Sequence, residues 1–242
     1  MLPVYDNRLP LNVVIMAGGQ GKRLRPLTND TPKALLEVGN KPIAERLVGH
    51  LNSFGLKNLC FSVGHLGEKI KTYFGDGTVL GVNIRYLNEY QPLGSIGIIG
   101  HQSEWTHEQF LVINGDLLTN FDVERFYNQF KQSNADLAVA TYNYSLEIPW
   151  GILEVSETGN VKRIREKPTI SRQINAGIYL FKQKMLNLFP PNEPYEGWQM
   201  LKDAIEQNYH VIALPIEGYW VDIGNLSDFE RAQQMIFGSV KA

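Results

Sequence analysis

The sequence predicts an α/β protein with a doubly wound, mainly parallel but mixed sheet and helices on both faces. Short continuous apolar runs end in glycine or small polar groups, as strands buried on both faces of a parallel sheet do. Segments with apolar residues at helical spacing alternate with these runs, which is the order of a doubly wound sheet. In the second half, two short strands flank a turn-forming segment, so we expect additional antiparallel strands.

The first half supplies most of this alternation. Residues 12–17, Asn-Val-Val-Ile-Met-Ala, form an apolar run that ends at Gly18 and predicts the first strand. Pro42 opens a helical pattern that Gly55 ends. Asp122 is placed to cap a later helix with its side chain. The remaining expected elements are strands at 58–63, 83–87, 110–113 and 136–142, and helices at 66–74 and 122–132.

The pattern changes in the second half. Gly151–Val155 and Val161–Arg165 flank Ser-Glu-Thr-Gly-Asn, a sequence typical of a hairpin loop. Strands are then expected at 174–181, at 210–214 and ending at 220–224, with helices at 199–207 and 229–237. We expect residues 1–11 to be an irregular lead-in and residues 12–242 to form a single domain built on one continuous sheet.

The composition excludes several classes of protein. Of the 242 residues, 23 are Lys or Arg and 25 are Asp or Glu, which argues against nonspecific nucleic-acid or membrane-surface binding. Cys60 is the sole cysteine, so an internal disulfide and a multi-thiolate metal site are both excluded. No apolar run approaches the roughly 18 residues of a membrane span. Because residues 1–6 do not resemble a secretory signal, we expect a cytoplasmic protein with neither nucleic acid nor membrane as partner.

A glycine-rich loop follows the first predicted strand. Gly18, Gly19 and Gly21 permit a tight turn and present backbone N–H groups to an anion. Arg23 and Arg25 add charge of the sign that phosphates require. The loop therefore has the features of a phosphate-binding loop, although a purely structural turn between a strand and a helix remains an alternative at this point.

Two familiar nucleotide motifs do not fit this loop. A Walker loop needs a glycine where Met16 stands and Ser or Thr where Arg23 stands. A dinucleotide fingerprint that begins at Gly19 needs its third glycine where Leu24 stands. The loop therefore belongs to neither class.

Ordered motifs along most of the chain narrow the choice. The N-terminal motifs are Gly18-Gly19-Gln20-Gly21-Lys22-Arg23-Leu24, Pro32-Lys33-Ala34-Leu35-Leu36 and Gly39-Asn40-Lys41-Pro42-Ile43. The later ones are Leu93-Gly94-Ser95-Ile96-Gly97, Asn114-Gly115-Asp116, Glu166-Lys167-Pro168, Asn175-Ala176-Gly177 and Trp220-Val221-Asp222-Ile223-Gly224. Together they resemble the sugar-1-phosphate nucleotidylyltransferases, or NDP-sugar pyrophosphorylases, over residues 12–237. The resemblance implies a Rossmann-like nucleotidyltransferase fold.

Two departures concern the nucleotide. Members of the family often have Thr where Lys22 stands, and Thr-Ala or Ser-Ala where Ser95-Ile96 stands. The second departure affects the base-side pocket. Guanine is the favoured base, because the segments 73–77 and 86–89 are similar to those of short guanylyltransferase-like members, but uridine and thymidine types stay open, and so does the sugar.

The resemblance implies a reaction between an NTP and a sugar 1-phosphate that gives an NDP-sugar and pyrophosphate. The attacking phosphate oxygen is already an anion, so positioning and cations supply nearly all the catalysis. The implied catalytic residues are Arg23 and Lys33. The implied nucleotide-binding residues are Ala17, Gly18, Gly19, Gly21, Arg23, Glu89 and Gly94. The implied sugar-phosphate-binding residues are Gly151, Glu166, Lys167, Asn175 and Gly177. The resemblance is also compatible with a homo-oligomer.

Asp116 and Asp222 are the expected ligands of a metal ion. Each ends a predicted strand, and in a parallel sheet both would lie at carboxyl ends, where such folds bind ligands. Two converging carboxylates repel each other unless a cation lies between them. Mg²⁺ prefers oxygen ligands and is usually held by one or two carboxylates and by substrate phosphates. The alternative is that each aspartate caps the helix that follows it.

Other functions remain open at this level. A nucleotidylyltransferase for a non-sugar phosphate such as phosphocholine would use the same loop, although Glu166 and Asn175 favour a sugar. A catalytically silent domain that senses NTP or sugar is a second alternative, and an adaptor that uses the fold for protein contacts is a third. Taken singly, Arg23, Lys33 and Lys167 are each also compatible with solvated surface residues.

Overall fold

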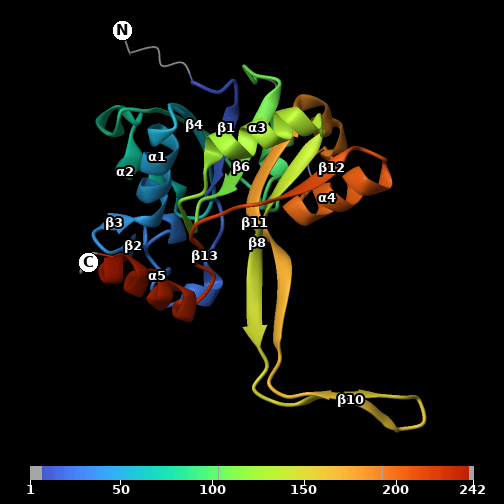
Figure 1. Ribbon diagram of the computed structural model, residues 1–242. Coiled ribbons are helices and arrows are strands. Elements are labelled where there is room, and N and C mark those ends of the chain that lie inside the picture. The colour runs from blue at the N-terminus through green and yellow to red at the C-terminus, as the bar shows by residue number, and fades with distance from the viewer. Residues whose placement is uncertain (1–6, 103, 192, 240–242) are drawn as a thin grey trace.

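The computed structural model describes residues 7–102, 104–191 and 193–239. Within these residues a seven-stranded sheet has the order β12-β8-β11-β6-β1-β4-β5 (Figure 1). Its strands are β1 (Asn12–Met16), β4 (Asn58–Val63), β5 (Asn83–Asn88), β6 (Gln109–Asn114), β8 (Leu137–Glu147), β11 (Thr169–Lys182) and β12 (Val211–Pro215). Only β11 runs against its neighbours, β6 and β8. The predicted mainly parallel, mixed sheet is confirmed.

Helices cover both faces of this sheet. They are α1 (Ile43–Ser53), α2 (Gly67–Phe74), α3 (Val123–Ser133), α4 (Gly197–Glu206) and α5 (Leu226–Ser239). In β1, Val13 belongs to the core cluster shared with α1, α2 and α3, whereas Val14 belongs to the cluster shared with α4. Successive strand residues point to opposite faces, so a strand buried on both sides needs an uninterrupted apolar run. The predicted double winding is confirmed.

Short elements lie between the sheet and α5. Strands β7 (Leu117–Thr119) and β13 (Trp220–Asp222) pair antiparallel as a separate two-stranded sheet. Another such pair is β2 (Glu37–Val38) with β3 (Lys41–Pro42). Five 3₁₀ helices lie elsewhere along the described chain as well as here: Lys22–Leu24, Lys33–Leu35, Thr78–Leu80, Gly97–His101 and Gln183–Leu188. The prediction that Asp222 ends a strand of the main sheet is therefore wrong, because β13 pairs with β7 in a sheet of its own.

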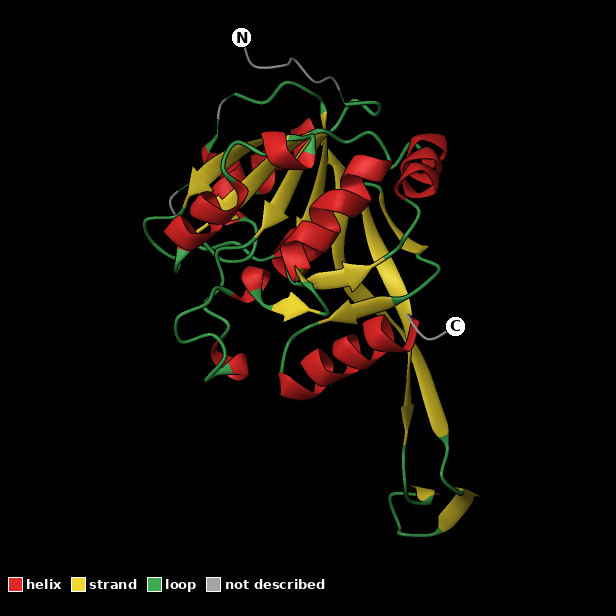
Figure 2. Cartoon of the chain, turned by 90° about the vertical axis from the view of Figure 1, so that its left-hand side faces the viewer, coloured by secondary structure: helices red, strands yellow, loops and turns green. Residues whose placement is uncertain are grey.

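A long arm leaves the body of the molecule. Beyond Thr141 and before Asn175, β8 and β11 pair only with each other and project as a two-stranded ribbon (Figures 1 and 2). At its end lies a hairpin of β9 (Ile152–Val155) and β10 (Val161–Arg165), whose pairing confirms the predicted turn. This hairpin forms its own sheet, so the prediction of one continuous sheet is wrong. We call residues 142–174 the arm.

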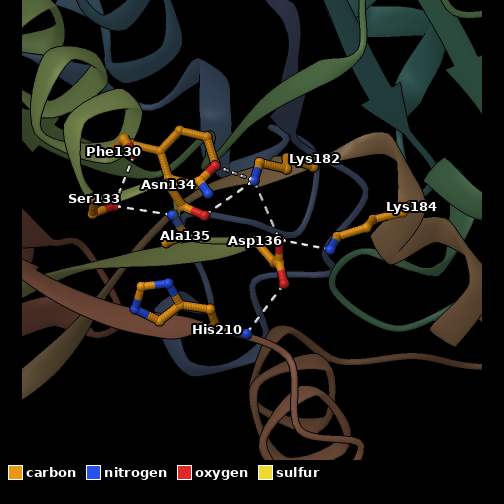
Figure 3. A network of polar contacts seen from close by, with 8 residues as sticks. All are labelled: Phe130, Ser133, Asn134, Ala135, Asp136, Lys182, Lys184 and His210. Carbon is orange, nitrogen blue, oxygen red and sulfur yellow. Dashed lines mark hydrogen bonds and ion pairs between the residues drawn. The ribbon is translucent and has the colours of Figure 1, made fainter.

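An ion-pair network fixes the opposite end of β8. The Asp136 carboxylate contacts Lys184 Nζ at 2.7 Å and Lys182 Nζ at 3.3 Å, and it accepts the His210 backbone N–H at 3.2 Å (Figure 3). Burial would raise the pKa of Asp136, but the hydrogen bonds from Lys184, His210 and Lys182 outweigh burial and hold that pKa below its ordinary value. The network ties together β12, β8 and β11 at the edge of the sheet opposite to the arm.

The described part of the predicted lead-in is irregular but anchored. Residues 1–6 lie outside the described residues. The Asn7 side chain accepts the N–H groups of Lys57 and Asn58 at 2.7 Å, and Leu9 and Leu11 are buried. Among the described residues, no helix combines the length and the apolar character that a membrane crossing requires.

Candidate active site

A cavity of about 600 Å³ lies where β1, β4, β5 and β6 end. Its lining residues are Met16, Ala17, Gly18, Gly19, Gln20, Lys33, Ala34, Gly64, His65, Glu89, Tyr90, Gln91, Pro92, Gly94, Ser95, Asn114, Gly115, Asp116 and Glu196. Most of them follow directly after a parallel strand of the main sheet. This is the edge at which open α/β sheets bind their ligands.

The glycine-rich loop forms one wall of the cavity. A Cβ atom on Gly18 would lie 2.6 Å from Glu89 Oε1, so any other residue at position 18 would displace that carboxylate or the loop. Glu89 in turn accepts a short hydrogen bond from the hydroxyl of Ser62. The His65 N–H donates to the carbonyl of Gly18 at 3.4 Å. The loop is therefore held against the ends of β4 and β5.

The structure brings most of the expected nucleotide residues together. Ala17, Gly18, Gly19, Glu89 and Gly94 all line the cavity. Gly21 and Arg23 lie outside the lining. Gly21 occupies the left-handed region, with φ 60°, and its carbonyl accepts the hydroxyl of Thr28 at 2.8 Å. It therefore shapes the loop from behind.

Lys33 lies between the two predicted metal ligands. Its ammonium forms an ion pair with Asp116 Oδ2 and lies 3.8 Å from Asp222 Oδ1. The Lys33 side chain is only 15% exposed. Arg23 lies beside Gly224: its Nη2 atom is 3.5 Å from the position that a Cβ atom on Gly224 would occupy. Two cations and two carboxylates thus lie close together, and Lys33 and Asp116 of this group also line the cavity.

Asp222 is an electrostatically strained carboxyl group. Burial raises its pKa, and the neighbouring Asp116 carboxylate raises it further, while Lys33 and Arg23 act in the opposite direction. The net direction is upward. A further cation between the two aspartates would relieve this strain.

The aspartates have unused coordination capacity. Asp116 Oδ1 and Asp222 Oδ1 are both buried and accept no hydrogen bond from any described residue. Within the same residues, no group of three or more His, Cys, Asp or Glu side chains is placed to hold a metal ion. Two carboxylates with free oxygens suit an ion such as Mg²⁺ that takes its other ligands from substrate phosphates and water.

The helix-cap alternative for these aspartates does not hold. Asp116 is followed by strand β7 rather than by a helix. At the start of α5, the N–H of Asp228 is accepted by the side chain of Asn225 at 3.0 Å, a role that Asp222 therefore does not have. The orphaned carboxylate oxygens point to a ligand instead.

The expected sugar-side residues fall into two groups. Asn175 and Gly177 lie beside Asn114 of the cavity wall: a Cβ on Gly177, whose φ is 70°, would lie 2.5 Å from Asn114 Nδ2. Asn175 donates to the Tyr179 hydroxyl at 2.7 Å and accepts the Gly177 N–H at 2.9 Å. This group therefore adjoins the cavity.

The second group lies on the arm. Gly151, Glu166 and Lys167 are all exposed and stand where the ribbon meets the tip hairpin, outside the cavity lining. A Cβ on Gly151 would lie 2.8 Å from Glu166 Oε2, so these two residues are neighbours. Within one chain, the structure does not bring them to Lys33 and the aspartates.

Glu196 is a cavity residue that the sequence analysis missed. Its carboxylate accepts the Ser95 N–H at 3.0 Å, and the Ser95 hydroxyl accepts the Gly197 N–H at 3.0 Å. Glu196 and Gln199 form a capping box at the start of α4. The Glu-x-x-Gln spacing was the available signal for the start of this helix. No sequence signal linked it to the turn at Ser95.

Comparisons with known proteins give independent information about the chain as a whole. A family model described as "Nucleotidyl transferase" matches residues 12–237. UTP–glucose-1-phosphate uridylyltransferase from Synechocystis sp. is 28% identical over 241 residues, which cover 92% of this chain and 62% of that protein. Mannose-1-phosphate guanylyltransferase catalytic subunit beta from Xenopus tropicalis is 28% identical over 238 residues, covering 96% of this chain and 66% of that protein. The chain thus spans about two thirds of the length of these relatives.

A solved structure supports the fold independently. HddC from Yersinia pseudotuberculosis superposes with a TM-score of 0.74 at 24% identity, covering 93% of this chain and 99% of that one. At this identity the likeness concerns the fold alone. The cavity at the carboxyl edge of the sheet is thus set in an architecture that is already known.

Proposed function

Since the chain belongs to the nucleotidyl transferase family, we propose that it transfers a nucleotidyl group from an NTP to a sugar 1-phosphate, giving an NDP-sugar and pyrophosphate. The observation that carries the proposal is Lys33 set between Asp116 and Asp222 at the wall of a glycine-lined cavity. The activities named for the two relatives, a uridylyltransferase for glucose 1-phosphate and a guanylyltransferase for mannose 1-phosphate, support both substrate classes.

The reaction is an in-line displacement. An oxygen of the sugar phosphate attacks the α-phosphorus, a new P–O bond forms, and the bond to the bridging oxygen of the β-phosphate breaks. The electron pair leaves with pyrophosphate, so the step balances without a proton transfer. Its barrier is set by the approach of two anions and by the charge that develops at the leaving group.

The cations of this chain meet that demand. Lys33 is held close to the cavity by Asp116, so its charge is positioned before substrate arrives. Arg23 belongs to the glycine-rich loop segment and lies beside Gly224. Its role in this proposal is to bind the β- and γ-phosphates that depart as pyrophosphate. Ala17, Gly18, Gly19 and Gly21 shape the nucleotide wall together with Glu89 and Gly94, and Asn175 and Gly177 form the sugar side.

Asp116 and Asp222 would hold a Mg²⁺ ion through the carboxylate oxygens that accept no hydrogen bond from the described residues. When bound, this ion supplies positive charge to the transferring phosphate. The two aspartates also orient Lys33, so they act on the reaction both through the ion and through the lysine. The same proposal takes residues 12–242 as a single catalytic domain in the cytoplasm.

A substrate grid tests this function. Each common NTP is combined with several sugar 1-phosphates and with phosphocholine, and release of pyrophosphate is measured with Mg²⁺ present. We expect turnover with at least one sugar 1-phosphate, with GTP ahead of UTP and dTTP. Turnover with phosphocholine alone would favour the non-sugar alternative. Tight NTP binding without turnover in any combination would favour a sensing domain and overturn the proposal.

A further inference from the structure

One face of the arm is largely apolar, although it includes Arg172, and the other face is polar. Paired residues of a ribbon lie on the same face, so Tyr144 with Arg172 and Leu146 with Ile170 form one row. The opposite row is polar, and in it the hydroxyls of Ser145 and Ser171 share a hydrogen bond of 2.8 Å. Such alternation is the pattern of a sheet with one covered face.

Among the described residues, this face is covered only at the base of the arm. There Tyr142 stacks on Trp220 with 5.3 Å between ring centroids, and the Trp220 indole donates to the Ala176 carbonyl at 2.9 Å. Further out on the same face, Tyr144 is 42% and Leu146 53% exposed. The apolar row that the body begins to cover thus continues into solvent.

The tip hairpin repeats this division. Arg165 forms an ion pair with Glu154 at 3.5 Å on one face. The other face carries Leu153 and Ile164, a directly paired couple that is 52% and 63% exposed. Of the sixteen large hydrophobic residues that are exposed in the described structure, seven lie in the 33 residues of the arm. Apolar surface concentrated in this way is typical of an interface.

A two-stranded ribbon is only marginally stable in water on its own. The arm therefore needs a partner, and its features favour an identical arm. A two-fold contact joins one patch to itself, and a face with an apolar row is self-complementary in this sense. Residues 142–174 hold five basic and four acidic side chains, so two arms would repel each other little.

We propose that two copies of this chain pack the apolar faces of their arms against each other, antiparallel about a two-fold axis near Tyr144, and that each arm delivers its tip to the cavity of the other copy. The first half of this statement rests on the arm alone. The second half rests on the proposed function.

The direction of β8 supports the second half of the proposal, in which each tip reaches the cavity of the other copy. Since β8 runs in the same direction as β1 and β6, its extension leaves the sheet at the edge that bears the cavity. The ribbon residues 142–147 carry the tip roughly 20 Å beyond that edge. An antiparallel partner ribbon runs back over the same length, so its tip arrives beside this chain's cavity.

The tip carries the groups that the cavity lacks. Lys162, Arg163, Arg165 and Lys167 fall within six positions and are all exposed. The cavity of one chain is lined by a single lysine, Lys33, among the described residues, although the proposed reaction brings two polyanions together. Glu166 and Lys167 of one copy would then serve the sugar phosphate bound in the other.

The oligomeric state tests the arm contact without any assay of activity. Analytical ultracentrifugation should give twice the 27.4 kDa of one chain for the wild type. Leu146→Glu should give the monomer mass, and Ser145→Glu, on the polar face, should stay dimeric. A monomeric wild type, or equal behaviour of the two variants, would overturn the contact. A Tyr144→Cys variant should oxidise to a covalent dimer, and Asn143→Cys, on the other face, should not. Native Cys60 is buried and does not interfere with this comparison.

Complementation tests the exchange of tips. Asp116→Asn and Lys167→Ala proteins are unfolded together in equal amounts and refolded, and turnover is measured with the best substrate pair. In a mixed dimer one site receives both changes and the other receives none. The sugar phosphate is kept well below its KM for the wild type, so that Lys167→Ala is nearly inactive. We therefore expect about a quarter of wild-type activity from two parents that each have little activity. No recovery, while mixed dimers are demonstrated by differently tagged chains, or full activity of Lys167→Ala alone, would overturn the exchange. A dimeric wild type without any turnover would contradict the proposed function and leave the arm contact standing.

Discussion

At the scale of single residues, Lys33 has two roles that a substitution separates. It is expected to stabilise the charge of the transition state, and its ion pair with Asp116 also neutralises a partly buried carboxylate. We predict that Lys33→Ala lowers turnover about a hundred- to a thousandfold. The unfolding temperature should fall as well, because Asp116 and Asp222 are left facing each other.

The matched control is Lys41→Ala, since Lys41 also forms an ion pair, with Glu45 at 2.9 Å, but its side chain is 53% exposed. Steady-state kinetics and thermal unfolding of both variants provide the check. Near-normal turnover of Lys33→Ala would remove this lysine from the mechanism.

The closeness of Gly18 to Glu89 gives a second prediction. In Gly18→Ala the new methyl group would meet Glu89 Oε1 at 2.6 Å, and Ser62 holds that carboxylate in place. We expect the loop to shift and the KM for NTP to rise severalfold, with less effect on the sugar phosphate. Gly19→Ala is the control, because its Cβ would meet nothing within 4 Å. Equal kinetics for the two variants would show that the contact does not position the loop.

Asp222 gives a prediction in which stability and activity change in opposite directions. Its pKa is raised in the folded protein. Ionisation of Asp222 therefore lowers the stability of the fold as the pH rises above the pKa of an aspartate in the unfolded chain. Without metal and at neutral pH, we expect Asp222→Asn to unfold at the same temperature as the wild type or higher. Assayed with Mg²⁺, the same variant should lose most of the wild-type turnover.

Wild-type activity should vanish in excess EDTA and return with added Mg²⁺. Full activity of the wild type in EDTA would contradict the metal assignment.

Sequence reasoning paired Asp116 with Asp222 on the assumption that both end strands of the main sheet. The structure brings them together through β7 and β13, a pair too short to leave a periodic signal in the sequence.

At the scale of elements, the sequence was most informative where strands are buried on both faces. The continuous apolar run at β1 predicted a strand buried on both faces, and its predicted position is confirmed. The arm was harder to interpret, because strands such as β9 and β10 are exposed and their periodicity does not say what covers them. The hairpin turn was predicted correctly, whereas its separation from the main sheet depends on contacts that lie outside the local sequence.

Asp136 gives an element-scale prediction about the anchoring of β8. Its pKa is lowered, so the stability it contributes is present above the pKa of an unfolded aspartate and is lost as the pH falls through the lower folded value. We expect Asp136→Asn to lower the free energy of unfolding by about 1–3 kcal/mol at pH 7. This deficit should shrink under acid conditions, where the wild type also loses the charge.

Urea unfolding at neutral and acid pH measures the effect of Asp136→Asn. Glu206→Gln provides the comparison, since its ion pair with Lys202 is long, at 3.7 Å, and exposed. A pH-independent deficit for Asp136→Asn would mean that shape rather than charge matters at this position.

At the scale of the whole molecule, the candidate site is divided between two parts of the chain. The body provides the glycine-rich loop, Lys33 and the aspartates, and the arm carries Glu166 and Lys167. Motif order predicted that all of these residues serve one reaction. It could not predict where the arm points, because that depends on what packs against its apolar face.

This division predicts opposite kinetic effects for two cations. Arg23 lies in the glycine-rich loop segment and beside Gly224, outside the cavity lining, so we expect Arg23→Ala to raise the KM for NTP more than the KM for sugar phosphate. Lys167 lies on the arm, so Lys167→Ala should show the reverse bias. Loss of one charge-assisted phosphate contact corresponds to about 1.5–3 kcal/mol, or roughly ten- to a hundredfold in the affected constant. Full kinetics with each substrate varied in turn measure both biases, and Lys162→Ala controls for the general charge of the tip. If both variants weakened the same substrate equally, the nucleotide and the sugar phosphate would not be bound by separate parts of the molecule.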